Sequence, residues 1–531
     1  MVVKFIPIAH TGMQRGREIV NSSCRWLLSG IFLFLAACSS LPSEFEQVPG
    51  QVWPHPEQTK LGRFIAETAP EDKTLSGVEL LAGPSEAFST RFAIAAFAEK
   101  TLDMQYYLWK GDLSGQLLMW RVLEAADRGV KVRFLIDDIY HAGRDIVYAI
   151  LDAHPNFQLR VFNPMANRGA ARNLNFLVNK TRLNHRMHNK IFMADGAVAV
   201  LGGRNIGDDY FGMDPDANFL DLDVLTVGQG AIEAGAAFDE YWNSKNAIPI
   251  GVLNDREYTA KELESYREEL KQALVQKDAV PYALAFTEQE TLENLHKWRD
   301  GLIWADATVV VDPLERFDGQ GESAIVQFAA DTVEHVDDEM IIQSAYLIPS
   351  KQGLENMAET VKRGVRVRML TNSLMSNNHI SAHSGYMKYR KAILETGAEL
   401  YELRADASLR KYFKANKNAE VAAGIHTKSF VLDGKQALIG SFNLDPRSRD
   451  LNSEIGLVVN NEEFSRQVIE HMDREFEPAN SYRLFLNDKG KLRWEVQTGD
   501  GIEIQTHDPG ASIWRRMAAR IMSWLPIEKE L

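Results

Sequence analysis

Apolar and polar positions along the chain follow the same order twice. In each half, an apolar stretch of strand length (residues 102–107 and 340–346) precedes a helical stretch that ends at an Arg-Gly pair, and a second apolar stretch follows that pair (128–133 and 363–368). Strands that alternate with helices in this way are typical of an α/β sheet. A repeat of ~240 residues indicates two like domains, because solenoid repeats have periods of about 20–50 residues. The pattern therefore predicts two α/β domains of similar topology.

A doubled polar motif follows these elements. Its pattern is His-x-Lys-(x)4-Asp-(x)6-Gly-[Gly/Ser]-x-Asn. The first copy comprises His188, Lys190, Asp195, Gly202, Gly203 and Asn205. The second copy comprises His426, Lys428, Asp433, Gly440, Ser441 and Asn443. Every member of the second copy lies 238 positions after its counterpart. A doubled set of titratable and phosphate-binding residues indicates one active site assembled from two halves.

Each copy of the motif is predicted to form a β-hairpin. Apolar residues on either side of Asp195-Gly196 and of Asp433-Gly434 predict two strands joined by a tight turn. Successive side chains of a strand point to opposite faces, so the His and the Lys two positions later project from the same face. The Gly-Gly and Gly-Ser pairs allow a close backbone approach near the two Asn residues. We assign Asp195 and Asp433 to the turns rather than to the chemistry.

The motif residues suit phosphodiester chemistry if the two halves pack about a pseudo-twofold axis. Two ammonium groups and two amides can then bind the non-bridging oxygens of a phosphate. One imidazole can attack phosphorus, and the other can protonate the leaving alcohol and deprotonate the incoming one. Each His needs a carboxylate that sets its tautomer. Asp221 and Glu454 follow the two motifs at suitable distances, and Asp223 competes with Asp221 on the same strand face.

Clusters of His and Asp also occur in metal sites, and the lysines distinguish the two cases. An ammonium group two positions after each His cannot ligate a cation and would repel one. We therefore expect neither a metal nor another cofactor. The net charge of −14 argues against nucleic acid as a partner, because proteins that bind the phosphate backbone without sequence preference are more often basic.

The N-terminus has the pattern of an export signal. Basic residues up to Arg25 precede the apolar run 26–37, which is shorter than the ~20 residues of a membrane-spanning helix and suits the core of a signal peptide. The run ends in Leu-Ala-Ala-Cys38, which resembles a bacterial lipoprotein box, whose cysteine is lipidated; a plain cleaved signal is the alternative. Since Cys24 and Cys38 are the only cysteines, no disulfide supports the folded body. We expect a lipid-anchored protein of a bacterial cell envelope that faces the periplasm, at the outer or the inner membrane.

Composition and the repeat divide the chain into segments. They are a signal peptide (1–37), an extended Pro-containing tether after Cys38 (38–75), an N-terminal α/β domain (76–245), a charged helical connection (246–305), a C-terminal α/β domain (306–480) and a C-terminal tail (481–531).

The tail contains an amphipathic helical pattern. At about 100° per residue, one face carries Trp514, Met517, Ala518, Ile521, Trp524 and Leu525, with Ile513 at its edge. The other face carries Arg515, Arg516 and Arg520. A basic amphipathic helix with interfacial Trp residues is typical of a helix that lies on a membrane surface. The alternative is a helix that docks its apolar stripe on the protein's own surface.

The two motifs resemble the paired HKD signatures of the phospholipase D superfamily. Segments 187–190, 202–211 and 440–448 resemble the bacterial cardiolipin synthase C type within it. The resemblance implies two phospholipase D-like domains packed about a pseudo-twofold axis, with the active site at their interface. It also implies metal-free transfer through a phosphatidyl-histidine, with His188 as the nucleophile and His426 as the acid/base.

The same resemblance implies a membrane-associated phosphatidyltransferase that makes cardiolipin by transfer to phosphatidylglycerol. Phospholipid substrates and the membrane surface are then the expected partners. With water as the acceptor, the same site would be a phospholipase D that releases phosphatidic acid. An exported nuclease of this fold is a further alternative, which the acidic composition opposes. A non-catalytic envelope lipoprotein is opposed by the intact motif in both halves.

Overall fold

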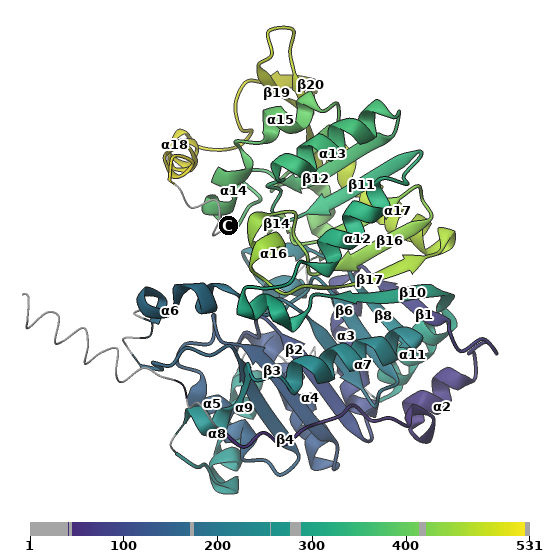
Figure 1. Ribbon diagram of the computed structural model, residues 1–531, viewed down its shortest axis with the longest axis vertical. Helices are drawn as coiled ribbons and strands as arrows, with labels where there is room; N and C mark the ends of the chain where they lie inside the picture. The colour runs from purple at the N-terminus through teal and green to yellow at the C-terminus, as the bar shows by residue number, and fades with distance from the viewer. Residues whose placement is uncertain are drawn as a thin grey trace, which may run out of the picture.

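The structure is a computed structural model that describes residues 41, 45–169, 172, 175–254, 256–276, 288–413 and 421–525. The predicted signal peptide and Cys38 lie outside these residues. Figure 1 shows the N-terminal half in the lower part of the molecule and the C-terminal half above it.

The N-terminal half is built on a mixed sheet. Its strand order is β9 (Ala247–Pro249), β4 (Phe157–Phe162), β3 (Lys131–Asp137), β2 (Thr101–Tyr106), β5 (Ile191–Ala194), β6 (Val198–Gly202), β8 (Asp223–Gly228) and β1 (Ser76–Leu81). β2, β3 and β4 run parallel, and the other pairs are antiparallel.

The C-terminal half repeats this order strand for strand. Its sheet runs β18 (Ser481–Leu486), β13 (Glu399–Leu403), β12 (Arg366–Asn372), β11 (Glu339–Ser344), β15 (Lys428–Leu432), β16 (Gln436–Gly440), β17 (Ile455–Asn460) and β10 (Ile303–Val311). β10 pairs antiparallel with β1, with Gly77 opposite Trp304, so the two sheets join at equivalent edges. With β19 (Leu492–Thr498) and β20 (Gly501–Gln505), these two sets of eight strands form one sheet of 18. The predicted fold of two similar α/β domains about a pseudo-twofold axis is confirmed.

Helices cover the sheets. The N-terminal half carries α3 (Pro84–Phe97), α4 (Leu113–Asp127), α5 (Asp145–Asp152), α6 (Asn175–Asn184) and α7 (Gln229–Trp242). The C-terminal half carries α12 (Ala324–Val333), α13 (Lys351–Lys362), α14 (Ile380–Tyr386), α15 (Arg390–Glu395), α16 (Pro446–Asp450) and α17 (Glu462–Phe476). The connection between the halves forms α8 (Ile250–Leu253), α9 (Ala260–Gln276) and α11 (Glu288–Asp300). Short 3-10 helices are η1 (Pro56–Gln58), η3 (Asp208–Tyr210), η4 (Leu314–Asp318) and η5 (Ser408–Phe413).

Polar side chains define where several of these helices begin. Asp112, Ser323, Ser350 and Asn461 each accept a hydrogen bond from a backbone N–H in the first turn of the helix that follows. Such N-caps satisfy donors that have no partner within the helix. They explain why α4, α12, α13 and α17 start where they do.

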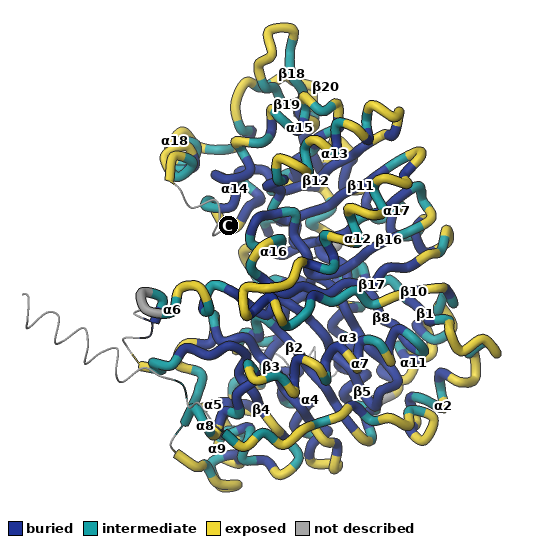
Figure 2. Tube along the Cα trace, in the orientation of Figure 1, coloured by how far each residue is buried: buried dark blue, intermediate teal, exposed yellow. Residues whose placement is uncertain are grey.

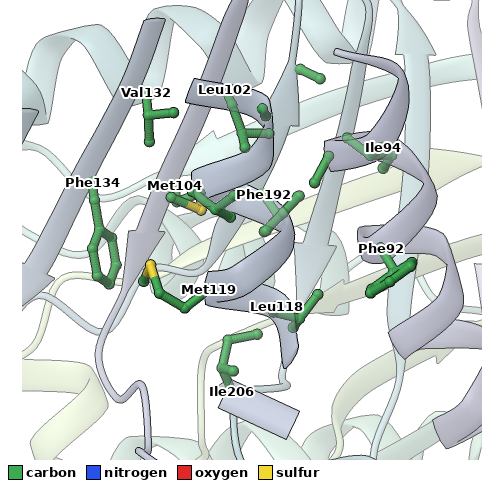
Figure 3. Close-up of a cluster of buried hydrophobic side chains, with 14 of the residues drawn as sticks. Phe92, Ile94, Leu102, Met104, Leu118, Met119, Val132, Phe134, Phe192 and Ile206 are labelled. Carbon is green, nitrogen blue, oxygen red and sulfur yellow. The ribbon is translucent and has the colours of Figure 1, made fainter. Parts of the chain in front are cut away.

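Two large apolar clusters stabilise the halves. In the first, side chains of α3 and α4, among them Phe92 and Leu118, pack on Leu102, Met104 and Phe134 of the N-terminal sheet (Figure 3). The second is shared between the halves, where β6 packs against β16 and β17. Because both halves contribute apolar surface to this shared cluster, hydrophobic burial holds them in a defined relative position.

The structure places three segments differently from the predicted boundaries. From residue 45 onward, the segment predicted to be an extended tether packs on the N-terminal half. Gln47 Nε2 donates to the carbonyl of Ser244 at 2.9 Å, and Leu61 and Ile65 of α2 (Lys60–Ala66) are buried. β9 and β18, predicted to lie in the connection and the tail, each add a strand to the edge of a sheet. Backbone pairing with β4 and β13 is non-local and is invisible in the local pattern.

The amphipathic tail forms α18 (Ile513–Met522), which docks on α14, but not through its apolar stripe, so the alternative of a docked stripe is wrong. Arg515 Nε donates to the carbonyl of Leu374 at 3.0 Å, and Ala519 is buried. The apolar stripe faces outward, with Trp514 75% and Trp524 77% exposed, and Figure 2 shows α18 largely in the colour of exposed residues. Among the described residues, no helix combines the length and apolar character needed to cross a membrane.

Candidate active site

The two motif hairpins are built alike. β5 and β6 meet at Asp195-Gly196, where φ is 57° and 61°, and β15 and β16 meet at Asp433-Gly434, where φ is 51° and 62°. Two consecutive residues with positive φ are the geometry of a tight hairpin turn, which Gly adopts freely and Asp tolerates.

The two turn aspartates also fasten each hairpin to the neighbouring strand. The backbone N–H groups of residues 99–101 donate to the Asp195 carboxylate at 2.7–3.1 Å. Residues 337–339 donate to Asp433 in the same way at 2.8–3.0 Å. The structure thus places both carboxylates at the start of β2 and β11, away from the imidazoles.

The two motif histidines pair with carboxylates of the opposite half. Nδ1 of His188 lies 2.7 Å from Oε2 of Glu454. Nδ1 of His426 lies 2.6 Å from Oδ2 of Asp221. All four side chains are buried. Each half therefore contributes the His of one pair and the carboxylate of the other.

Backbone pairing between the halves produces this exchange. β7 (Ala217–Leu220) runs parallel to β14 (Ala422–Ile425), and the N–H of His426 donates to the carbonyl of Leu220 at 2.8 Å. On the other side of the pseudo-twofold axis, Met187 bridges Ser453, and the N–H of His188 donates to the carbonyl of Ser453 at 2.9 Å. Each carboxylate directly follows the residue that pairs with the opposite motif, so its side chain reaches the opposite imidazole.

The structure separates the two aspartates that the sequence could not distinguish. Asp221 contacts His426, whereas Asp223 is buried in ion pairs with Arg91 at 2.8 Å and Arg204 at 3.3 Å. Asp223 therefore neutralises buried arginines of the N-terminal half and does not contact an imidazole.

The Gly-Gly and Gly-Ser difference between the motifs also has a physical reason. A Cβ at Gly203 would lie 2.1 Å from Oδ1 of Asp221, so only glycine fits there. In the other half, Ser441 Oγ donates to Glu454 Oε2 at 2.5 Å, and Asn452 Nδ2 lies 3.3 Å from Oε1. The carboxylate next to His188 is thus held by a side chain, whereas Asp221 packs directly on backbone.

One cleft brings the predicted residues of both halves together. It has a volume of about 660 Å³, and His188, Asn205, His426 and Asn443 all line it. Lys190 and Lys428 lie beneath it, each almost completely buried, with Nζ donating to the carbonyl of the motif histidine two positions earlier.

Aromatic side chains that the sequence reasoning missed pack against the imidazoles. Tyr107 meets the His188 ring edge-on with centroids 4.8 Å apart, and Tyr210 meets the His426 ring at 5.0 Å. The hydroxyl of Tyr210 also accepts a hydrogen bond from Asn205 Nδ2 at 3.1 Å. Tyr107 directly follows β2, whereas Tyr346, which also lines the cleft, lies two residues after the end of β11, so the 238-residue spacing of the motif does not align the two tyrosines.

Burial controls the charge states of the site. It lowers the pKa of His188 to about 4 and that of His426 to about 3, against the opposing effect of the paired carboxylates. It also lowers the pKa of Lys190 to about 7 and that of Lys428 to about 8. Because each carboxylate accepts from Nδ1, a neutral imidazole carries its proton there and leaves the lone pair on Nε2.

The carboxylates stay ionised in this surrounding. Burial alone would raise the pKa of Asp221 and of Glu454, but the adjacent imidazole and lysine of each site bring the pKa below its ordinary value. No group of three or more His, Cys, Asp or Glu side chains in the described part of the chain is arranged to hold a metal ion.

Comparisons with known proteins show the family of this chain. A family model described as cardiolipin synthase, PLD-like domain, matches residues 94–241 and again residues 331–477, which include one motif each. Cardiolipin synthase C of Escherichia coli K12 is 35% identical over 449 residues, which cover 83% of this chain and 93% of that protein. Cardiolipin synthase A of Pseudomonas syringae is 23% identical over 76% of this chain and 69% of that protein.

A solved structure shows the same fold at low sequence identity. The phosphatidylserine synthase of Haemophilus influenzae superposes with a TM-score of 0.52 at 13% identity, over 87% of this chain and 96% of that one. The doubled family match and the identity to cardiolipin synthase C place this chain in the phospholipase D superfamily, as a member of the family of cardiolipin synthase, PLD-like domains.

Proposed function

We propose that this chain is a membrane-associated phosphatidyltransferase that makes cardiolipin by transferring a phosphatidyl group to phosphatidylglycerol. The observation that carries the proposal is the crossed arrangement of His188–Glu454 and His426–Asp221 at one cleft. Such an arrangement supplies two imidazoles to one phosphate. Exchange of one head group for another requires both, one as the nucleophile and one as the acid and base. The 35% identity to a cardiolipin synthase over most of both chains supports the choice of substrate.

In the first step, Nε2 of His188 attacks the phosphorus of a phospholipid. The bond from phosphorus to the head-group oxygen breaks, and protonated His426 gives its proton to the departing alcohol. The Nδ1–H of His188 stays hydrogen-bonded to Glu454, which stabilises the positive charge that develops on the ring. The product of this step is a phosphatidyl group bound to His188.

In the second step, His426 is neutral and serves as the base. It removes a proton from the head-group hydroxyl of phosphatidylglycerol, whose oxygen attacks phosphorus while the bond to His188 breaks. His426 is then protonated and His188 is free again, so the enzyme ends in its starting state. Asp221 holds the His426 ring in position through both steps.

The lysines explain why a buried site can hold a phosphate. Lys190 and Lys428 are buried and have lowered pKa values in the empty site. A bound phosphodiester adds a negative charge beside them, which raises the pKa of the lysines and of the imidazoles. Substrate binding therefore favours the two ammonium groups and the protonated His426 that the first step uses.

The proposed membrane association rests on two features. The N-terminal sequence carries the lipoprotein pattern at Cys38. The exposed apolar stripe of α18 lies beside the cleft, because α18 packs on α14, and Ser381 and Ala382 of α14 line the cleft. An apolar, Trp-bearing face next to the cleft suits an interfacial helix. We propose that the protein is lipid-anchored and faces the periplasm.

A lipid product assay tests the function. The mature chain is incubated with labelled phosphatidylglycerol and phosphatidylethanolamine in mixed micelles, and the products are separated by chromatography. Labelled cardiolipin is the expected product. Phosphatidic acid as the sole product would contradict the transferase and identify a phospholipase D.

Two variants serve as controls for the assay. His188→Ala and His426→Ala should each abolish turnover, because neither imidazole can perform both roles. Substantial residual activity in either variant would contradict a shared site.

A further inference from the structure

An apolar hollow lies in the C-terminal half, between α12, α13 and the strands β11, β15 and β16. Figure 1 shows α12 and α13 in the upper part of the molecule, which is the C-terminal half. Its volume is about 340 Å³, within the range of about 300–1,000 Å³ that is usual for small-molecule sites. Most of its lining is apolar, including Val326 and Ala329 of α12, Phe430 of β15 and Leu438 of β16. These α12 side chains are only half-buried in the structure. The hollow therefore offers hydrocarbon a surface that the protein's own side chains do not fill.

The equivalent region of the N-terminal half is filled. At the 238-residue spacing of the motif, Val326, Ala329 and Ala330 of α12 correspond to Phe88, Arg91 and Phe92 of α3. Those three N-terminal side chains are buried, with exposed fractions of 0%, 1% and 4%. Helix α3 thus shows how the same position of the fold is filled in the other half. Smaller side chains on α12 open space that aromatic rings and a guanidinium occupy on α3.

The strand that lies beneath the helix also carries a smaller residue in the C-terminal half than in the N-terminal half. Arg91 forms an ion pair with Asp223, which pairs in the sheet with Gly202. The counterpart of Gly202 is Gly440, and its partner in the sheet is Gly456. Both members of the buried ion pair are therefore replaced by small residues in the C-terminal half, and the lining of the hollow is apolar.

The hollow adjoins the active-site cleft. Asn443 lines the cleft, Leu444 lines the hollow, and Asp445 lines both. The same order occurs on the neighbouring segment, where Tyr346 lines the cleft and Ile348 lines the hollow, and the two segments pair at Leu347 and Leu444. The polar cleft and the apolar hollow are thus adjacent, and these two paired segments lie between them.

We propose that this hollow binds one acyl chain of the phospholipid whose phosphate lies at His188 and His426. The assignment rests on the proposed function and adds to it a binding site for the hydrophobic part of the substrate. An amphiphile with a charged phosphodiester and a hydrocarbon chain matches a polar cleft beside an apolar hollow. Transfer of methylene groups from water into the hollow is favourable, and it selects for substrates with long chains.

A variant that fills the hollow tests the assignment. Ala329→Phe places a ring where Arg91 lies in the N-terminal half. Phosphatidyl transfer is compared between a phosphatidylglycerol with dihexanoyl chains and one with dioleoyl chains. The variant should lose about tenfold or more in kcat/KM on the dioleoyl lipid, because several methylene groups lose their site. It should retain the kcat/KM of the unmodified chain on the dihexanoyl lipid, which does not reach the hollow.

The matched control is Ala236→Phe, the same substitution at an exposed position of α7 that lines neither cavity. It should leave both substrates unaffected. An equal loss on the two lipids in the Ala329→Phe variant, or no loss on either, would overturn the assignment of the hollow.

Photolabelling tests the hollow without turnover. A phosphatidylglycerol with a diazirine at the end of one acyl chain is bound to the full chain and irradiated, and the adduct is mapped by mass spectrometry. Adducts are expected on α12 and β15, and Ala329→Phe should reduce them. Adducts confined to α18 or to other surfaces contradict the hollow. A chain that is labelled at α12 but transfers no phosphatidyl group contradicts the proposed function instead.

Discussion

Glu454 accepts a hydrogen bond from Nδ1 of His188 at 2.7 Å, although 266 residues separate them and they belong to opposite halves of the molecule. His426 and Asp221 repeat the relationship in the reverse direction at 2.6 Å. Neither half contains a complete His–carboxylate pair at this site. Both His–carboxylate pairs therefore form only when the two halves are packed in this one arrangement.

Kinetic measurements can distinguish the role of the carboxylates of Glu454 and Asp221 from that of the turn aspartates. Glu454→Gln and Asp221→Asn should each lower kcat by about 100- to 10,000-fold, because the amide no longer sets the tautomer or stabilises the charged ring. KM should change little, since neither side chain is proposed to bind the phosphate. Asp433→Asn is the matched control, because Asp433 binds only backbone at the start of β11. A kcat of Glu454→Gln close to that of the unmodified chain would refute the orienting role.

The pKa shifts predict the pH dependence of kcat/KM, which reports on the free enzyme. Activity should fall below about pH 4, as protonation removes the lone pair of His188, whose pKa is lowered to about 4. Above about pH 4, kcat/KM should decline as the pH rises, because His426, whose pKa is lowered to about 3, must take up the proton that the first step gives to the leaving alcohol. It should also fall as the pH rises through about 7 to 8, where Lys190 and Lys428 lose their charge. The measurement is kcat/KM between pH 3 and pH 9 on a short-chain lipid. A profile that stays flat from neutral pH to pH 9 would contradict a role for the buried ammonium groups.

The Arg91–Asp223 ion pair predicts a structural effect that is separate from catalysis. Asp223→Asn should lower the free energy of unfolding by about 3–5 kcal/mol, because it leaves buried Arg91 without its ionised partner. The double variant Arg91→Met, Asp223→Leu should recover part of that loss, since the charges of Arg91 and Asp223 are then both removed, whereas buried Arg204 still lacks its carboxylate partner. Urea denaturation of the three chains measures the effect. A double variant less stable than Asp223→Asn would show that the pair itself stabilises the fold.

The exposed face of α18 predicts weaker membrane binding when it is made polar. Trp514→Glu combined with Ile521→Glu should reduce sedimentation with anionic liposomes by about tenfold, because interfacial binding scales with buried apolar area. Ile232→Glu on α7, which is also exposed, is the control for a change of charge alone. Turnover of a dihexanoyl lipid in solution should be unchanged. Liposome binding equal to that of the unmodified chain would assign the stripe to another partner.

Much of the fold was predictable because the repeat is long and its motif is spaced identically in both halves. The alternation of strands and helices, the hairpin turns and the convergence of the two halves all follow from local pattern plus duplication. The exchange of carboxylates between the halves did not follow from the sequence, because it depends on the pairing of β7 with β14. This pairing brings His426 to Asp221, although the two residues are 205 positions apart in the chain. Nothing in the local sequence distinguishes Asp221 from Asp223 until Arg91 is placed against one of them.

The tail shows a second limit of pattern reasoning. The apolar stripe of α18 was evident from its periodicity, but a stripe does not reveal which face docks. Here the contact uses Arg515, whose guanidinium donates to the carbonyls of Leu374 and Asn377. Those carbonyls belong to backbone whose position is set by the C-terminal sheet, so only the folded chain shows the orientation.

The most direct test of the account is to trap and map the covalent intermediate. The chain is mixed with a phospholipid labelled in its phosphatidyl group, quenched with denaturant under alkaline conditions, and digested for mass spectrometry. The account predicts a phosphatidyl adduct on His188, retained in Glu454→Gln at a lower rate of formation and absent from His188→Ala. An adduct that persists in His188→Ala, or that maps to His426 alone, would contradict the assigned roles. Turnover without any histidine adduct would contradict the mechanism itself.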